Sequence, residues 1–512
     1  MLKKDDIEKG EDIYAFSVSS VLLISVTIIA AALRIYRLGY QSLWMDEVLT
    51  YLSSNGTLAH VLFQTEVHTS ILPLYYLFVH AFLYLGEEDI ILRVPSLIFG
   101  TLSIPFFFMV VRDMLGSVTG AIASFLLAIS PFHIFYSQEA RPYALYLFLC
   151  LLTLYLLQQC LNREDNHWWK LGFIVAAAST FYCHTTAVPF LVFLGLYIMI
   201  MLPKQKWPEW IPTFLGLGIL LLPALYRIYT IQVGWESARS FEAPYLLYIL
   251  WAFSTGFSLG PNLIELHQPD KMKYIVQYLP VIVPIFMYVS TVFALGVWKL
   301  FQKDKGIFLI LVLLFLLPVI FVGLAAMLNV GPFNTRYIIP SLLPFLVFVA
   351  LGVQNFQKTP FQVVGVCIFI VISMVSLNNY YFDDHYHRED SRGASQFLAE
   401  HAIQGDLIIC MAPYTKTTLL HYLPSANNFR VVGYPKDNAF VNPINIPEDL
   451  QEIIAGRNRF WVFFSRIFHA DPTGYFKSHL ESFFSPTNKF NSTGVELILY
   501  EIPKMVYLPE RQ

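Results

Sequence analysis

The sequence has little charge. Only 13% of its 512 residues are Asp, Glu, Lys or Arg, and the formal net charge is −3. A soluble protein of this length would carry roughly twice that share of charged residues. Because nucleic-acid-binding proteins need a strongly basic surface, the small net charge excludes a nucleic-acid partner from our expectations.

Cysteine motifs and cofactor loops are also missing. The five cysteines form no CxxC pair and no Cys/His cluster, so neither a disulfide framework nor a zinc knuckle is indicated. There is no GxGxxG or Walker sequence, and therefore no nucleotide site is predicted.

Apolar residues dominate instead, at 56% of the chain, with 16% aromatic residues. Charge-poor apolar runs recur along the first three quarters of the sequence, at 14–33, 94–111, 115–135, 142–161, 171–186, 188–202, 210–226, 274–298, 307–328, 337–354 and 361–380. The pattern predicts a polytopic α-helical membrane protein with about eleven transmembrane helices.

Two further apolar runs, 71–86 and 245–260, are shorter. We expect each to lie at the membrane interface or to dip into the protein rather than to cross. If 71–86 crossed, all later loops would change sides.

The orientation follows from the lysines. With a cytoplasmic N-terminus, the lysine-rich loops, such as the one holding Lys299, Lys303 and Lys305, all lie inside. An odd number of crossings then places everything after about residue 381 outside. The external loops would still carry six arginines, and anion binding is one explanation for them: Arg34, Arg37, Arg93, Arg141, Arg239 and Arg336.

From His385 the character of the chain changes, with frequent charges and short β-rich runs that alternate with helical stretches. This alternation indicates a compact α/β module. We therefore predict two domains: a membrane domain over 1–384, with a first external loop at 34–93, and a soluble extracytoplasmic α/β domain over 385–512.

Two groups of polar residues stand out beside the apolar runs. Asp46 and Glu47 follow the first helix directly; they form either a solvated pair at a helix start or a general base or cation ligand. Gln138, Glu139 and Arg141 interrupt two long apolar runs, where charges are costly and more often functional. The structural alternative is that Arg141 only forms an ion pair with Glu139.

Several motifs carry a resemblance to a known family. They are Leu-Trp-Met-Asp-Glu ending at Glu47, His68 to Tyr76, Leu92 to Ser96, Ser130 to Arg141, Thr180 to Thr185, Thr335 to Pro340 and Arg388 to Ala394. The sequence resembles the membrane glycosyltransferases with a GT-C-type fold that use polyprenyl-phosphate-linked sugars, in the branch of protein O-mannosyltransferases and the lipid A aminoarabinose transferase. Relatives commonly have Pro-Pro soon after the His, whereas here Thr-Ser-Ile-Leu-Pro follows His68.

The resemblance implies transfer of one sugar from a polyprenyl-phosphate carrier to an acceptor hydroxyl of a protein, lipid or glycan on the outer face. Asp46 would be the base of an inverting displacement, with Glu47 beside it. Arg141 and Arg336 would grip the lipid phosphate, because a guanidinium offers two parallel hydrogen bonds.

The resemblance also implies binding roles for His68, Gln138 and Glu139. Glu47 and Glu139, with His68 and His184, could hold a divalent metal, the one cofactor left open. The structural alternatives are a packing role for His184 and an interfacial position for Arg336.

Two other classes of protein remain as alternatives. A transporter or flippase would also need many helices, but the sequence shows no inverted pair of Gly/Pro-broken helices. A scaffold would bind through its outer domain. Within the enzyme reading, the module after residue 385 is expected to orient the acceptor or cap the site, not to catalyse.

Overall fold

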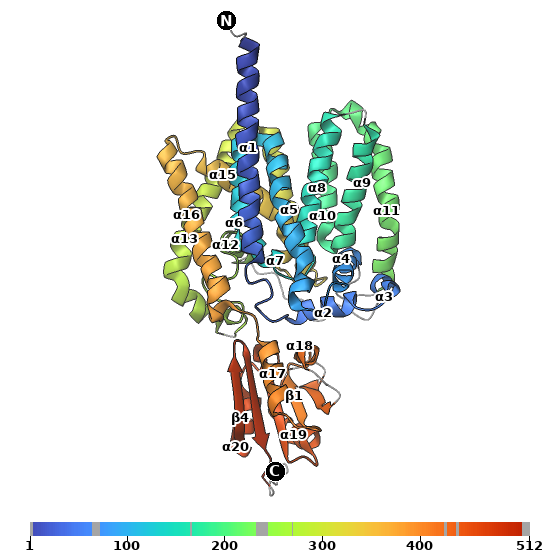
Figure 1. Cartoon of the computed structure of the whole chain (residues 1–512), viewed down its shortest axis with the longest axis vertical. Helices are drawn as coiled ribbons and strands as arrows, with labels where there is room; N and C mark the ends of the chain where they lie inside the picture. Colours follow the sequence, from blue (N-terminus) through green and yellow to red (C-terminus); the bar gives the residue numbers. More distant parts are fainter. Residues whose placement is uncertain are drawn as a thin grey trace. The chain divides into compact units, whose positions relative to one another are not determined.

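The computed structural model describes residues 4–63, 72–163, 166–231, 244–268, 270–423, 428–436 and 440–503, with side chains from Ser20 onward. The chain divides into two compact units (Figure 1). The membrane unit comprises Met1–Leu38, Ser53–Leu259 and Pro280–Asn378. The α/β unit comprises Gly39–Leu52, Gly260–Leu279 and Asn379–Gln512, so it includes two segments that precede the last membrane helix in the sequence.

In its described residues, the membrane unit consists of helices joined by turns and short loops. Its main helices are α1 (Lys4–Ile35), α3 (Leu58–Phe63), α4 (Leu74–Leu83), α5 (Asp89–Leu115), α6 (Ser117–Ile129), α7 (Pro131–Ser137), α8 (Tyr143–Asn162), α9 (His167–Cys183), α10 (Val188–Met201), α11 (Ile211–Thr230), α12 (Pro244–Thr255), α13 (Lys271–Lys303), α14 (Lys305–Met327), α15 (Leu342–Val353) and α16 (Thr359–Phe382). Short 3₁₀ turns, among them η2 (Thr185–Ala187), η3 (Lys204–Trp210) and η5 (Thr335–Ser341), connect some of them.

Within the described residues, seven helical segments are long and apolar enough to cross a membrane, or eight if the bent pair α6–α7 is one span. The predicted fold class, a polytopic helical membrane protein with a small α/β domain, is confirmed. The count of eleven crossings is not, because the described residues give seven or eight such segments, and α9 and the apolar segment Thr185–Met201 are each too short for the length test. The runs at 71–86 and 245–260 form only the short helices α4 and α12.

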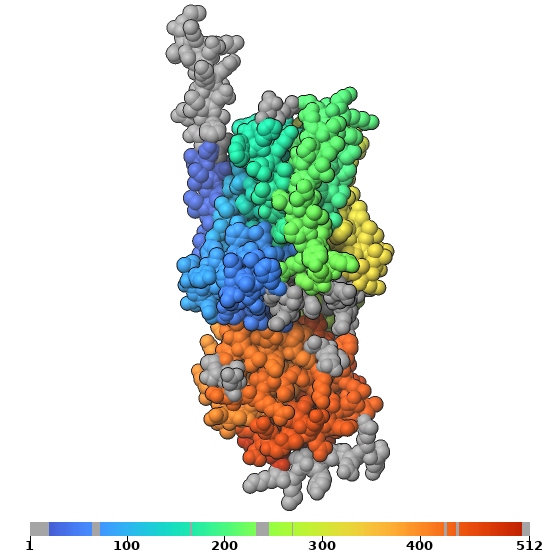
Figure 2. Space-filling model, turned by 90° about the vertical axis from the view of Figure 1, so that its right-hand side faces the viewer, coloured from blue at the N-terminus to red at the C-terminus, as the bar shows by residue number. Residues whose placement is uncertain are grey.

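Exposed apolar side chains mark the lipid-facing surface. Helix α11 packs on α9 and lies on the outside of the membrane unit, where its apolar side chains are open to the surroundings (Figure 2). Leu215, Ile219 and Leu222 are each at least 60% exposed, which would be costly in water and is favourable against lipid.

Helices α13 and α15 approach closely through a pair of glycines. A Cβ at Gly296 would lie 1.7 Å from the carbonyl oxygen of Phe348, and one at Gly352 would lie 1.8 Å from that of Val292. Only glycine fits at both positions, as expected where small residues let two membrane helices meet backbone to backbone.

The run at 115–135, expected to be one crossing, is broken. Helices α6 and α7 meet at Ser130 with a bend of 58°, and Pro131 begins α7. Arg34, which is fully buried, donates to the carbonyls of Ala128 (3.0 Å) and Leu127 (3.3 Å) at the break. The guanidinium thereby satisfies backbone groups that the bend removes from the helix. Helix capping, rather than anion binding, accounts for this arginine.

The α/β unit holds a five-stranded sheet in the order β2-β1-β3-β5-β4. The strands are β1 (Leu407–Met411), β2 (Arg430–Tyr434), β3 (Arg459–Ser465), β4 (Ser485–Ser492) and β5 (Val495–Glu501). β1 is parallel to β2 and β3, whereas β5 is antiparallel to β3 and β4.

Helices cover both faces of this sheet. α17 (Ser391–His401) and α18 (Thr415–Tyr422) pack on one face, and α19 (Ile446–Ile454) and α20 (Tyr475–Phe483) pack on the other. Successive residues of β1 and β3 point to opposite cores, and both cores are apolar. These two strands are therefore continuous hydrophobic runs.

Candidate active site

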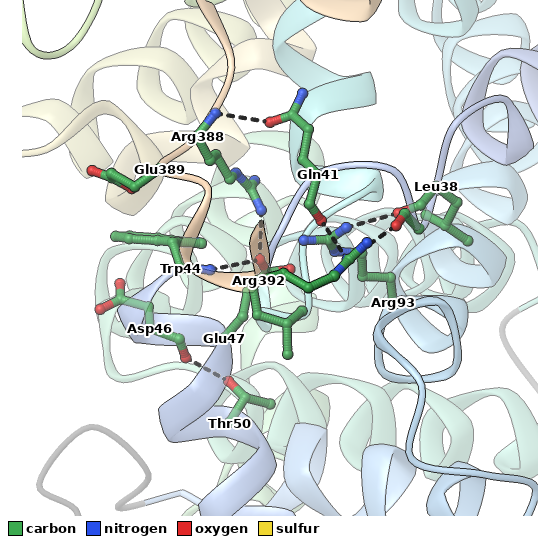
Figure 3. Close-up of polar contacts among 12 residues, drawn as sticks. Leu38, Gln41, Trp44, Asp46, Glu47, Thr50, Arg93, Arg388, Glu389 and Arg392 are labelled. Atoms are coloured by element: carbon green, nitrogen blue, oxygen red, sulfur yellow. Dashed lines mark hydrogen bonds and ion pairs between the residues drawn. The ribbon is translucent and has the colours of Figure 1, made fainter. Parts of the chain in front are cut away.

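Glu47 is buried in an ion pair within the α/β unit. It lies in the first turn of α2 (Met45–Ser54), has no exposed surface, and its Oε2 is 2.6 Å from Nη1 of Arg388. The same oxygen accepts the backbone N–H of Trp44 at 3.4 Å (Figure 3). The backbone N–H of Arg388 donates to Gln41 at 3.1 Å. Glu47 thus ties the start of α2 to the chain that follows α16.

Asp46 differs from its neighbour. Its side chain is half-buried, and Figure 3 shows it pointing away from the Glu47–Arg388 pair. Its backbone carbonyl accepts the Thr50 hydroxyl at 3.0 Å, which is an ordinary helical contact. Of the two adjacent acids, Glu47 is fully buried and Asp46 keeps part of its surface exposed.

The segment that carries both acids is held by the start of α17. Asp390 accepts the hydroxyl of Ser42 (3.1 Å) and caps α17 through the N–H of Gly393 (2.9 Å). Arg392 donates to the carbonyls of Gly39 (3.2 Å) and Gln41 (3.3 Å). The motif from Arg388 to Ala394 is thus a clamp on residues 39–47. Its partners could not be read from the sequence, because they lie about 340 positions earlier.

The other predicted residues belong to the membrane unit. Gln138, Glu139 and Arg141, in the turn between α7 and α8, are at most 6% exposed, and Arg336, in η5, is half-buried. The guanidinium of Arg336 lies 5.7 Å from the ring centroid of Tyr143.

His184 joins the same cluster. Its ring lies 5.6 Å from that of Tyr143, and the charges of both Arg141 and Arg336 act on it. Its Nδ1 also accepts the N–H of Thr186 at 3.2 Å, which caps η2. The structure therefore places Arg336 at an aromatic and histidine cluster that includes Tyr143, two residues after Arg141.

Gln138 has a structural contact of its own. Its amide Nε2 donates to the carbonyls of Arg34 (2.8 Å) and Tyr36 (2.7 Å), at the end of α1. The membrane unit thus fastens the turn that carries Glu139 and Arg141 to the end of its first helix. His68, the remaining predicted substrate ligand, lies outside the described residues.

The donor set for a metal is incomplete. Across the part of the chain that the structure describes, no group of three or more His, Cys, Asp or Glu side chains is placed to hold an ion. Glu47, one of the two predicted ligands, already pairs with Arg388. The described residues do not fit a divalent metal.

Comparison with known proteins agrees with the motifs. The model of the dolichyl-phosphate-mannose-protein mannosyltransferase family matches residues 68–229. No curated protein is significantly similar in sequence.

Solved structures share the fold. ArnT from Cupriavidus metallidurans in the apo state has a TM-score of 0.59 at 10% identity, covering 97% of this chain and 100% of that one. The same protein bound to undecaprenyl phosphate gives 0.56 at 12% identity, covering 96% and 99%. The oligosaccharyltransferase AglB from Archaeoglobus fulgidus, in complex with an inhibitory peptide and a dolichol-phosphate, gives 0.50 at 11% identity, covering 94% and 74%.

The family match over residues 68–229 and the fold shared with ArnT agree with the resemblance predicted from the motifs, to membrane glycosyltransferases that use a lipid-linked sugar donor.

Proposed function

We propose that this enzyme transfers a single sugar from a polyprenyl-phosphate carrier to an acceptor hydroxyl on the outer face of the membrane, with inversion at the anomeric carbon. The observation that carries the proposal is the position of Arg336, a half-buried cation against the rings of Tyr143 and Tyr337 in the membrane unit. A guanidinium in such a place suits a phosphate, whose oxygens it can bind through two parallel hydrogen bonds. A lipid phosphate is an anion that reaches such a place from the bilayer. ArnT and AglB have been crystallised with polyprenyl phosphates, which supports the same choice of donor.

In this mechanism Asp46 acts as the general base. Its carboxylate takes the proton from the acceptor hydroxyl as that oxygen forms a bond to the anomeric carbon. The bond from the anomeric carbon to the phosphate oxygen breaks, and the lipid phosphate leaves with the electron pair. Glu47 would position Asp46 through its ion pair with Arg388 rather than touch the substrate.

Arg336 and Arg141 would stabilise the phosphate. Arg336 keeps part of its surface open, and its guanidinium lies 5.2 Å from the ring of Tyr337 and 5.7 Å from that of Tyr143. Such rings orient a guanidinium through its face, and the edge of the group is the part that binds an oxyanion. Charge that develops on the leaving phosphate would be neutralised there without a proton transfer.

The outer location of the active site and of the α/β unit is part of the proposal and rests on the lysine distribution. A cysteine at exposed Glu400, in a Cys367→Ser background that removes the exposed native thiol, tests it. A membrane-impermeant maleimide should label this variant from outside sealed right-side-out cells. Labelling only after the cells are broken would show that the α/β unit lies inside, which is the opposite orientation.

A divalent metal is plausible for this fold, because a structure of the same fold holds zinc. AglB has been crystallised in complex with zinc, but the described residues of this chain do not form a comparable donor set. We therefore derive no step through a metal.

Transfer can be measured directly. The purified protein in nanodiscs, given a polyprenyl-phosphate sugar labelled in the sugar together with a membrane extract, should move the label to an acceptor and release polyprenyl phosphate. Asp46→Asn is the matched inactive control. Movement of the labelled lipid between leaflets of vesicles without sugar transfer would favour the flippase alternative.

A further inference from the structure

Two loops of the α/β unit share an unusual backbone. Ala412 directly follows β1 with φ 58°, and Arg466 directly follows β3 with φ 49°. Both are non-glycine residues in the left-handed region, which costs free energy and clusters at functional sites.

These loops leave the sheet at its switch point. β2 and β3 lie on opposite sides of β1 and are parallel to it, so the connections after β1 and β3 diverge. In open α/β sheets, ligands and functional side chains gather at this carboxyl edge. Here the edge presents Arg466 together with Tyr414, from the loop after β1.

Arg466 is fixed by a carboxylate and an aromatic ring. Its Nε donates to Oε1 of Glu389 at 2.6 Å, and its Nη2 donates to Oε2 at 3.4 Å. Its guanidinium lies 5.2 Å from the ring of Trp44, two residues before Asp46. Burial lowers the pKa of Arg466, but Glu389, Tyr414 and Asp46 together raise it by more, so the group is a permanent cation whose charge acts on Asp46.

We propose that Arg466 is a positioning residue of the transfer reaction, which holds Trp44 and the Asp46 carboxylate in their working geometry from the switch point of the α/β unit. The inference rests on the proposed function in taking Asp46 as the base. It gives the module after residue 385 a direct part in the active site, beyond capping it or orienting the acceptor.

The same strand offers a matched control. Arg459 begins β3, at the opposite edge of the sheet, and pairs with Asp406 through Nε (2.9 Å) and Nη2 (2.8 Å). The side chains of Arg459 and Arg466 are 26% and 22% exposed. Loss of either arginine removes one bidentate pair of similar burial, but Arg466 also packs on the ring of Trp44, two residues before Asp46.

The experiment compares Arg466→Gln with Arg459→Gln for kcat, donor KM and Tm. We expect Arg466→Gln to lower kcat about 10- to 100-fold, as for a displaced catalytic group, with donor KM nearly unchanged. Arg459→Gln should lower Tm by a similar amount and keep kcat within about twofold. In an Asp46→Asn background, Arg466→Gln should cause no further loss, because its effect passes through that carboxylate.

Equal kcat for the two arginine variants would overturn the inference, as would a full additional loss in the Asp46→Asn background. If Arg466→Gln does not fold, Arg466→Lys against Arg459→Lys decides in the same way, because lysine keeps the charge but not the bidentate fork. A wild-type protein that transfers no sugar would instead refute the proposed function, and this inference with it.

Discussion

The ion pair between Glu47 and Arg388 predicts an unequal effect of single and double substitutions. The two side chains are 0% and 10% exposed and lie 2.6 Å apart. Arg388→Met leaves the Glu47 carboxylate buried without that cation, and breaking a buried pair in this way costs about 3–5 kcal/mol. We expect the α/β unit to lose that much stability, a large part of the 5–15 kcal/mol typical of a domain.

The double variant Glu47→Met/Arg388→Met tests whether that loss of stability comes from the buried charge or from the missing contact. Replacing both partners by apolar side chains of similar volume is often neutral or stabilising, so most of the loss should be recovered. Unfolding in detergent, followed by circular dichroism with denaturant, measures both proteins. If the double variant is as unstable as Arg388→Met, the pair is not what holds the start of α2, and the assignment of Glu47 as a positioning residue is wrong.

Four further outcomes follow from the structure. Asp46→Asn should lower turnover about 10²–10⁴-fold with little change in donor binding, measured at saturating donor and acceptor; near wild-type turnover would remove Asp46 from the mechanism. Arg336→Ala should first raise the donor KM, which a titration with polyprenyl-phosphate sugar tests. Gly352→Ala should lower the Tm, because the new Cβ would meet a carbonyl oxygen at 1.8 Å, whereas Gly195→Ala, with nothing within 4 Å, should not. Burial raises the pKa of the Glu389 carboxyl, but the Arg466 cation lowers it by more, so that the pKa lies below its ordinary value of 4.5. The stability that the ionised carboxylate contributes is therefore complete above pH 4.5 and is lost as the pH falls through the lowered pKa. Glu389→Gln should flatten that part of a curve of Tm against pH.

Much of the fold could be predicted because it depends on local patterns. Apolar runs foretold the helices, and alternating β-rich and helical stretches foretold the α/β module. The bend between α6 and α7 was missed, since its apolar run continues through Ser130 and only Pro131 hints at a break. The stabilising partner, Arg34, lies about 94 positions earlier in the chain and looked like a loop cation.

The candidate site was predictable in its residue types but not in its pairings. Asp46, Glu139 and Arg141 stood out because charges beside apolar runs are rare. Arg466 gave no such signal, since an arginine among the charges of a soluble module is unremarkable. Only the tertiary structure shows that a loop after β3 reaches the segment of Trp44.

The different surroundings of Asp46 and Glu47 explain how adjacent acids can divide two tasks. A carboxylate that is to accept a proton needs access to substrate and a fixed orientation. Other residues have to fix that orientation. Glu47, with no exposed surface, anchors the first turn of α2 to Arg388, and the half-buried Asp46 follows Trp44, on whose ring the cation Arg466 packs. Because Arg388 and Arg466 come from separate segments of the α/β unit, the orientation of Asp46 depends on that unit being folded. A substitution in the unit's sheet that loosens the loop after β3 should therefore reduce turnover before it reduces donor binding.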